Sequence, residues 1–255
     1  MDFWAVIAGF AVGTVVGMTG VGGGSLMTPL LITVFKLPPA MAIGTDLWFA
    51  AITKSGGSWA HWRHGHVETR ITMWLLAGSL PAAVVTVGLM HLTGLQLGWS
   101  SGLTAALGVA LLLTAVCVAY REAWARIGLG LERWLPQRHK PALTVAAGAL
   151  LGVLVTLSSI GAGAIGATLL LLLYPRLPAQ RIVGTDIAHA VPLTLAAGIG
   201  HAFLGHVDWT LLAALLVGSL PGIWLGAQLT RKLPEDLVRG LLCLSLIAAG
   251  LKVLA

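Results

Sequence analysis

The stretch LPPAMAIGTDL, from Leu37 to Leu47, returns 140 residues later as LPAQRIVGTDI, from Leu177 to Ile187. The similarity extends to both sides of this pair. AGFAVG and GVGGGS in the first copy correspond to AGALLG and SIGAGA in the second, and HVETRITMWLLAGSLP corresponds to HVDWTLLAALLVGSLP. A repeat this long indicates a duplicated half, because solenoid units are only about 20 to 50 residues long. We therefore expect two halves, residues 1–120 and 143–255, joined by a basic linker over residues 121–142.

The composition is that of a membrane protein. The chain is 57% hydrophobic and 9% charged, whereas about a quarter of the residues in soluble domains are charged. Stretches near the length of about 20 residues that a helix needs to cross a bilayer are Ile71–Leu92, Leu97–Tyr120, Val183–Leu204, Trp209–Leu229 and Leu237–Ala255. Only helices and closed barrels span lipid, and these runs lack the short alternating strands of a barrel. We predict an all-α polytopic protein of the plasma (inner) membrane, surrounded by the lipid bilayer.

The remaining compositional features add little to this class. The N-terminus has no basic region of the kind that begins a signal peptide, so we interpret it as retained structure. Cys117 and Cys243 lie inside apolar stretches, as packing residues do. The net charge of +6 comes from basic residues between the stretches, which is a topology signal. No nucleic-acid partner is expected.

Each half begins with an apolar segment that is too long for one span. Phe3–Phe35 has 33 residues, about 50 Å as a single helix, and Gly20-Val21-Gly22-Gly23-Gly24 interrupts it. Leu143–Tyr174 is interrupted in the same way around Gly161-Ala162-Gly163. Limbs of about 15 residues are too short to cross alone. Each segment is therefore either a broken helix that crosses or a re-entrant hairpin that returns.

The distribution of basic residues along the chain distinguishes these two alternatives. Crossing segments give parallel halves with four spans each, and hairpins give inverted halves with three full spans each. The inverted arrangement places five basic residues of the second half on the side of the linker, and the parallel arrangement places them opposite: Arg176, Arg181, Arg231, Lys232 and Arg239. Because basic residues concentrate on the cytoplasmic side, we predict inverted repeats, each a re-entrant hairpin plus three transmembrane helices. The linker is then cytoplasmic, and both termini lie outside.

The two breaks are candidate anion sites. Interrupted helices in membranes recur in secondary transporters, and a helix N-terminus presents free N–H groups and partial positive charge. The candidate substrate-binding residues are Thr19, Gly22, Gly23, Gly24 and Ser25 at the first break, Ser158, Ser159, Gly161 and Gly163 at the second, and Lys54. The alternative is that the glycines serve only close helix packing. Lys54, which corresponds to Thr194, either neutralises the anion or extends to the interface.

Two acids are embedded in apolar sequence. Asp46 and Asp186 follow Thr45 and Thr185, and a charge at the centre of a membrane helix costs about 2.5–3.5 kcal/mol on the insertion scale. They carry a coupling proton, or they accept N–H groups from the adjacent break. His189 lies three residues after Asp186 on the same helical face and can pair with it. Its counterpart is Phe49.

Two further patterns give no catalytic or metal site. His61, His64 and His66 cluster in sequence, but only His61 and His66 recur, so we expect a loop or interfacial role and no metal. The repeated Gly-Ser-Leu-Pro at 78–81 and 218–221 is typical of helix bends or packing seams. The chain lacks the nucleophile-elbow, zinc-protease and phosphate-loop motifs. We predict no enzyme activity and no cofactor.

The segment GMTGVGGGSLMTPLL, the GTD that follows it, and the second copy SSIGAGAIGATLLL with its own GTD resemble the TauE/SafE family of membrane permeases. The family is associated with sulfite and organosulfonate export. The resemblance covers essentially the whole chain and implies an anion carrier for small sulfur-containing acids such as sulfite, sulfoacetate or thiosulfate, with a proton or sodium ion as coupling ion. The second copy departs from the first at Ala162, Ala164 and Thr168, where the first has Gly23, Ser25 and Pro29.

The leading hypothesis is a secondary transporter for a small anion that works by alternating access, with its site between the two broken-helix hairpins. An anion channel and a non-transporting structural membrane subunit are the alternatives. The oligomeric state stays open.

Overall fold

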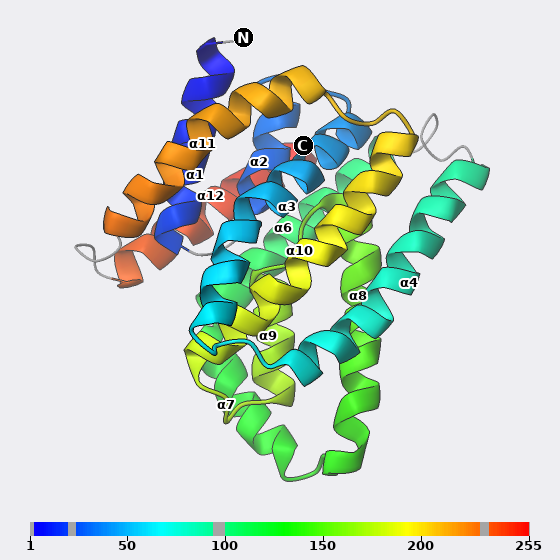
Figure 1. The fold of residues 1–255 in the computed structure, drawn as a ribbon, viewed down its shortest axis with the longest axis vertical. Coiled ribbons are helices and arrows are strands. Elements are labelled where there is room, and N and C mark those ends of the chain that lie inside the picture. The colour runs from blue at the N-terminus through cyan, green and yellow to red at the C-terminus, as the bar shows by residue number, and fades with distance from the viewer. Residues whose placement is uncertain (1–2, 20–23, 94–99, 230–234, 255) are drawn as a thin grey trace.

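The computed structural model describes residues 3–19, 24–93, 100–229 and 235–254, and all regular structure within these ranges is helical (Figure 1). The first half forms α1 (Phe3–Thr19), α2 (Gly24–Thr33), α3 (Pro39–Arg63), α4 (Thr69–Thr93) and α6 (Ser100–Ala119). The linker forms α7 (Arg121–Glu132) and the short 3-10 helix η1 (Gln137–His139). The second half forms α8 (Lys140–Ser158), α9 (Ala164–Leu173), α10 (Ala179–Phe203), α11 (Trp209–Leu229) and α12 (Glu235–Leu254).

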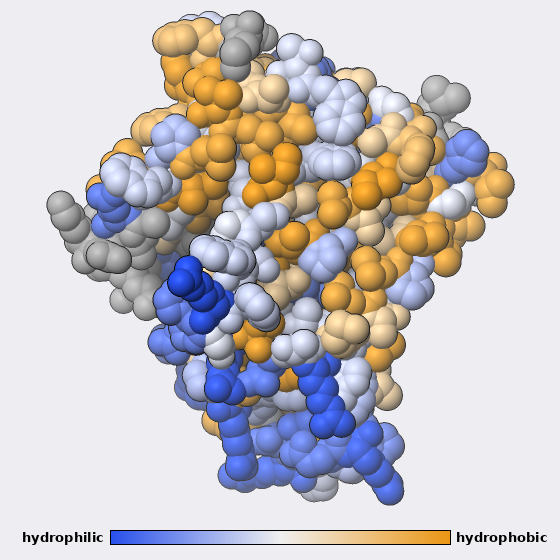
Figure 2. Space-filling view, in the orientation of Figure 1, coloured by the Kyte–Doolittle hydropathy of each residue, from blue (hydrophilic) through white to orange (hydrophobic). Residues whose placement is uncertain are grey.

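Several of these helices are long and apolar enough to cross a membrane. Four pass by themselves, over Thr69–Leu92, Gln137–Ser158, Ala179–Phe203 and Trp209–Gly226, and α6 and α7 pass together as a pair bent by 80°. Large apolar side chains on α4 and α11 face outward, and Trp224 is 69% exposed. Figure 2 shows hydrophobic surface over much of the molecule and hydrophilic surface at the end where α7 lies. The prediction of an all-α polytopic membrane protein is confirmed.

The second broken segment forms a hairpin whose two ends lie together. Glu132 at the end of α7 accepts a hydrogen bond from Lys140 at the start of α8, with 3.1 Å between Nζ and Oε1. The same carboxylate accepts one from Arg176, just beyond α9, at 2.8 Å between Nε and Oε2. The hydroxyls of Thr144 and Tyr174 also meet at 2.8 Å. The segment therefore returns to the end from which it started.

The predicted limb lengths need correction. The limbs are unequal, with 17 and 10 residues in α1 and α2 and 19 and 10 in α8 and α9. The first limb of the second hairpin is longer than expected because α8 begins at Lys140, before the apolar run. With η1 it is long enough to cross a membrane alone. The second limbs, α2 and α9, are each about 15 Å long, so they are too short to cross a membrane alone, as the sequence predicted for every limb.

The helix pairs of the two halves are reciprocal. α1 packs along α11, and the counterpart of this pair, α8 with α4, packs in the same way. α3 packs on α10 and α6 on α12, so each of these helices meets its own counterpart. In Figure 1, α1 and α11 run downward, whereas their counterparts α8 and α4 run upward. These features favour the inverted arrangement, whose orientation in the membrane stays a prediction.

Glycines make the seam between α4 and α8. A Cβ added to Gly148 would overlap the backbone carbonyl oxygen of Leu75, and one added to Gly78 would overlap that of Val145. The other pair repeats this, since Gly218 of α11 lies against the carbonyl of Val6 in α1. The glycine that begins each Gly-Ser-Leu-Pro repeat therefore lies where two helices pack closely, as small residues do in membrane helices.

This close packing gives a stability prediction. We expect Gly148→Ala to destabilise the protein by about 1–3 kcal/mol, because the helices must separate to admit a methyl group. Gly88→Ala is the matched control within α4, since its added Cβ meets nothing within 4 Å, and we expect it to be neutral or stabilising by up to about 1 kcal/mol. Thermal unfolding in detergent measures both. Equal losses of stability in the two variants would contradict the close helix packing at Gly148.

Two of the basic residues that decide the predicted topology, Arg176 and Arg181, lie at the α7 end, whereas Arg231 and Lys232 lie outside the described residues. Arg181 at the start of α10 forms an ion pair with Glu68, in the connection between α3 and α4. Arg176 pairs with Glu132 in the linker. The parallel arrangement would place Arg176 and Arg181 at the opposite end from the linker, so these contacts favour inverted halves.

Candidate functional site

The two Gly-Thr-Asp motifs hold loops of the opposite half. Oγ1 of Thr45, in α3, accepts a hydrogen bond from the backbone N–H of Asp208, in the loop between α10 and α11, at 3.0 Å. Oγ1 of Thr185, in α10, accepts the equivalent bond from Glu68, in the loop between α3 and α4, also at 3.0 Å. Both threonines are fully buried. They therefore join the halves at two symmetric contacts, which we call the clasps.

The glycine of each motif lets the opposite loop approach. A Cβ on Gly44 would overlap the carbonyl oxygen of His206, and a Cβ on Gly184 would overlap that of His66. The histidine rings of each loop pack together, with centroids 5.7 Å apart for His61 and His66 and 5.5 Å apart for their counterparts His201 and His206. Within the described part of the chain, no group of three or more metal-ligating side chains could hold a metal ion.

The aspartate of each motif faces the second limb of its own broken segment. Asp46 is fully buried and accepts a hydrogen bond from the hydroxyl of Thr28 in α2. Asp186, which is 3% exposed, lies beside the backbone N–H of Gly163 at the start of α9. A Cβ on Gly166 would overlap Oδ1 of Asp186. Both carboxylates thus contact the limb that follows a break, as a supporting role requires, and this position leaves the role of proton carrier open as well.

The second break has the backbone geometry that an interruption requires. α8 ends at Ser158, and Ser159 is left-handed with φ 58°. Gly161 and Gly163 have φ of 127° and 141°, values that L side chains rarely adopt. The Ser158 hydroxyl donates to the carbonyl of Leu154 at 2.6 Å, so it is used within α8. The candidate donor that the break leaves free is Ser159.

Lys54 connects the first half to this break. Its side chain is 8% exposed, so it does not extend to the interface. Its Nζ donates a hydrogen bond of 2.6 Å to the carbonyl oxygen of Ala162, between the two glycines of the break. It lies close enough to Asp186 and Asp46 for their charges to interact. Its counterpart Thr194 donates to Ala190 within its own helix, so this link has no copy.

Several polar atoms around Lys54 are buried without a hydrogen-bond partner. They are Oδ1 of Asp46, Oδ1 of Asp186, Oγ of Ser159 and Nδ1 of His189. Ser159 interacts electrostatically with Asp46 without meeting it in hydrogen-bonding geometry. Buried polar atoms are nearly always paired with protein or water. Unpaired donors and acceptors from both halves are therefore candidates for contacts with water or with a small polar ligand.

His189 does not pair with Asp186 as predicted. The imidazole is fully buried, and its Nε2 meets Oγ of Ser79 in α4 at 2.9 Å instead of bonding Asp186. Spacing along α10 placed both side chains on one face, but α4 supplies a nearer partner for His189, and Asp186 turns toward α9. His189 is still close enough to Lys54 for their charges to interact.

The first break lies outside the description. Gly22 and Gly23 are not among the described residues, and neither are the side chains of Thr19, Gly24 and Ser25. Sequence reasoning missed Thr28, Ser79 and Gly166, the partners of Asp46, His189 and Asp186. Thr28 and Gly166 lie in the limb after each break, where an acid that supports the break needs contacts, and this signal could have found them.

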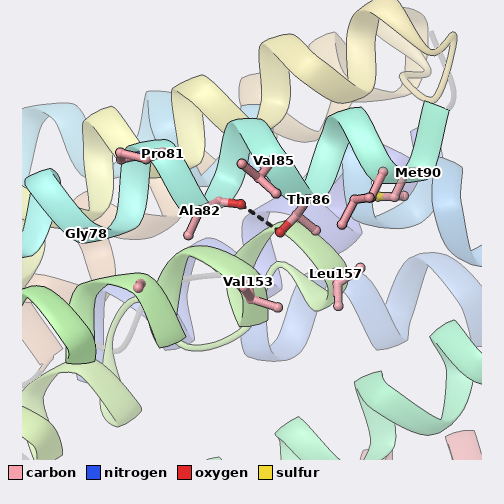
Figure 3. Close-up of a pocket in the computed structure, with 10 residues that line it drawn as sticks. Gly78, Pro81, Ala82, Val85, Thr86, Met90, Val153 and Leu157 are labelled. Carbon is pink, nitrogen blue, oxygen red and sulfur yellow. Dashed lines mark hydrogen bonds between the residues drawn. The ribbon is translucent and has the colours of Figure 1, made fainter. Parts of the chain in front are cut away.

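A separate pocket of about 540 Å³ lies between α4 and α8 (Figure 3). Its lining is apolar and includes Pro81, Val85, Val153 and Leu157. The hydroxyl of Thr86 donates to Ala82 in its own helix at 2.7 Å, as the dashed line in Figure 3 shows. None of the lining residues is charged, so the pocket suits hydrocarbon better than an anion.

An all-helical membrane protein with buried charges and unpaired polar groups between two repeated halves belongs to the class of membrane transporters. The family model described as "Sulfite exporter TauE/SafE" matches residues 5–253. This chain therefore belongs to the TauE/SafE family.

Relatives of the chain carry transporter names. It is 38% identical to "Probable membrane transporter protein YjnA" of Bacillus subtilis, over 257 residues that cover both chains completely. It is 28% identical to YdhB of the same organism, over 98% of each chain. It is 23% identical to YunE, over 98% of this chain and 96% of that one. Both carry the same description as YjnA. No solved structure matches.

Proposed function

We propose that this protein is a secondary transporter that exports small sulfur-containing anions such as sulfite or organosulfonates across the cell membrane. The observation that carries the proposal is the Lys54 ammonium, buried at the second break among unpaired polar groups. The family description names sulfite export, which supports the substrate class.

The free donors suit a small oxyanion. The Lys54 ammonium has three N–H groups, one of which is used on Ala162. Ser159 offers an unpaired hydroxyl, and His189 offers a donor at Nδ1 in the tautomer whose Nε2 accepts from Ser79. Charge-assisted hydrogen bonds of this kind are the strong ones. Oxygens spread around one sulfur atom can meet several such donors together.

The two halves supply a route for alternating access. The clasps at Thr45 and Thr185 bind loops at opposite ends of the crossed pair α3 and α10. Opening one clasp while the other stays closed would expose the central site to one side only, which is the rocking motion of inverted-repeat transporters. The linker is then cytoplasmic and both termini lie outside.

Counterflow in proteoliposomes tests the transport function. Purified protein is reconstituted into vesicles loaded with unlabelled sulfite or methanesulfonate, and entry of the radiolabelled anion is followed. We expect uptake that saturates and that is faster when anion is present inside. Absence of flux for both anions under proton and sodium gradients would overturn the transport function. Unsaturated flux with single-channel currents would show a channel instead.

The inverted topology makes a labelling prediction. In a background without Cys117 and Cys243, we expect His64→Cys to react from the cytoplasmic side and Phe203→Cys from the outside, because they flank loops at opposite ends. Both positions are exposed, Phe203 to 89%. A membrane-impermeant maleimide on right-side-out and inverted vesicles measures this. Reaction of both cysteines from the same side is what parallel halves require and would contradict the topology.

A further inference from the structure

We propose that the central site takes up one proton with each singly charged anion, with the Asp186 carboxylate as the proton carrier and Lys54 as the partner of the anion. This rests on the proposed function and deepens it by naming the coupling ion and the group that carries it. The pH gradient across a cell membrane favours entry of an anion that moves with a proton, so export then follows the outward concentration gradient of an anion that the cell itself produces.

Three charged side chains are buried at the central site. Lys54 is one cation between two carboxylates, and the side chains of Lys54, Asp46 and Asp186 are 8%, 0% and 3% exposed. An incoming anion would be a third negative charge around one ammonium, and uncompensated buried charge is strongly unfavourable. One proton on a carboxylate removes one negative charge for each that the anion brings. The total charge of the cluster is then the same before and after loading.

The contacts of the two carboxylates indicate which of them carries the proton. Asp46 accepts a hydrogen bond from the Thr28 hydroxyl and has the Ser159 hydroxyl nearby, so its carboxylate already has hydroxyl partners. Among the described residues, no side-chain hydroxyl donates to Asp186. The groups that face it are the Gly163 N–H and the Lys54 ammonium, and its Oδ1 lies unpaired against Gly166. When Lys54 turns to an anion, Asp186 loses its cation, and protonation of the carboxylate compensates for that loss.

The other titratable side chains on the packed helices are engaged by other groups or lie near helix ends, and among them His189 is close enough to Lys54 for their charges to interact. On α10 itself, His189 bonds Ser79, and His201 bonds the carbonyl of Thr156. The others are near helix ends: His61 and Arg63 on α3, Arg70 and His91 on α4, Lys140 on α8, and Arg181 on α10, whereas α9 has none.

The coupling can be measured as accumulation driven by pH. Proteoliposomes with the membrane potential clamped at zero receive radiolabelled methanesulfonate, whose charge does not titrate, with the inside about one pH unit more alkaline. One proton per anion predicts accumulation of up to about tenfold. We expect Asp186→Asn to lose accumulation, so that the anion reaches the same concentration inside and outside. Accumulation is a ratio reached at steady state, so this readout does not depend on how fast the variant exchanges the anion. Glu122→Gln, an exposed carboxylate on α7, is the control that should accumulate as the wild type does.

Each outcome has a distinct meaning. Counterflow without pH-driven accumulation, or accumulation that follows a sodium gradient instead, overturns the proton coupling and leaves the transport function standing. Accumulation by Asp186→Asn at the wild-type level overturns the assignment to Asp186. Absence of counterflow in the wild type, with sulfite as well as with methanesulfonate, overturns both the coupling and the transport function. The wild-type result decides the coupling even if Asp186→Asn does not fold.

Discussion

Replacing Lys54 with threonine, the residue at its counterpart position, is expected to lower anion counterflow by about 100-fold or more. The substitution removes the cation that faces two buried carboxylates and leaves their charges uncompensated. Removing one partner of a buried, hydrogen-bonded charge pair in a binding interface costs about 2–5 kcal/mol, and each 1.4 kcal/mol is about tenfold in binding. Initial rates in proteoliposomes, normalised to the amount of reconstituted protein, measure the effect.

Two further variants separate transport from folding in this experiment. Lys252→Thr, at an exposed position near the end of α12, should transport as the wild type does. The double variant Lys54→Thr with Asp186→Asn restores the charge balance, so it should recover thermal stability without recovering counterflow. Wild-type counterflow by Lys54→Thr would show that the ammonium takes no part in anion binding.

Gly166→Ala is expected to reduce transport by about 100-fold while changing stability little. The added Cβ would overlap Oδ1 of Asp186. That atom is the end of a flexible side chain, so the carboxylate moves and the helices stay in place. Displacement of a functional group by about 1 Å can cost about 100-fold in rate. Counterflow and thermal unfolding are measured on the same preparation.

Gly57→Ala is the matched control for this displacement. It lies on α3, and the nearest atom to its added Cβ is 4.0 Å away, on Ile187. It should leave counterflow and stability unchanged. Full activity of Gly166→Ala would mean that the position of the Asp186 carboxylate does not matter. A large loss of stability would mean that the glycine serves helix packing alone.

Local sequence was enough to predict the class of fold and the places where helices break. Apolar runs predict membrane helices wherever they occur, and clustered glycines such as Gly161 and Gly163 disfavour a continuous helix in any context. The limb lengths were harder. The apolar run begins at Leu143, but α8 begins at Lys140, because Glu132 from the linker binds this charged residue at the helix start.

The partners of the candidate residues could not be predicted, because they come from distant parts of the chain. Thr45 and Thr185 are neighbours of the two acids in sequence, but their hydroxyls accept hydrogen bonds from loops of the opposite half. The sequence leaves Lys54 free to extend to the interface, and only the packing of α3 against the second break brings it to Ala162. A duplicated sequence says which residues correspond, whereas the contacts between copies depend on how the copies face each other.

Transport as proposed depends on binding of a small sulfur oxyanion at Lys54, between the two halves. Selenite is a heavier analogue of sulfite with an anomalous signal, so crystals grown with it give the most direct test. We expect an anomalous peak within hydrogen-bonding reach of Nζ of Lys54 and Oγ of Ser159, with ligand atoms about 3 Å from both. A peak only elsewhere, such as in the pocket between α4 and α8, or no peak at saturating selenite, would contradict it.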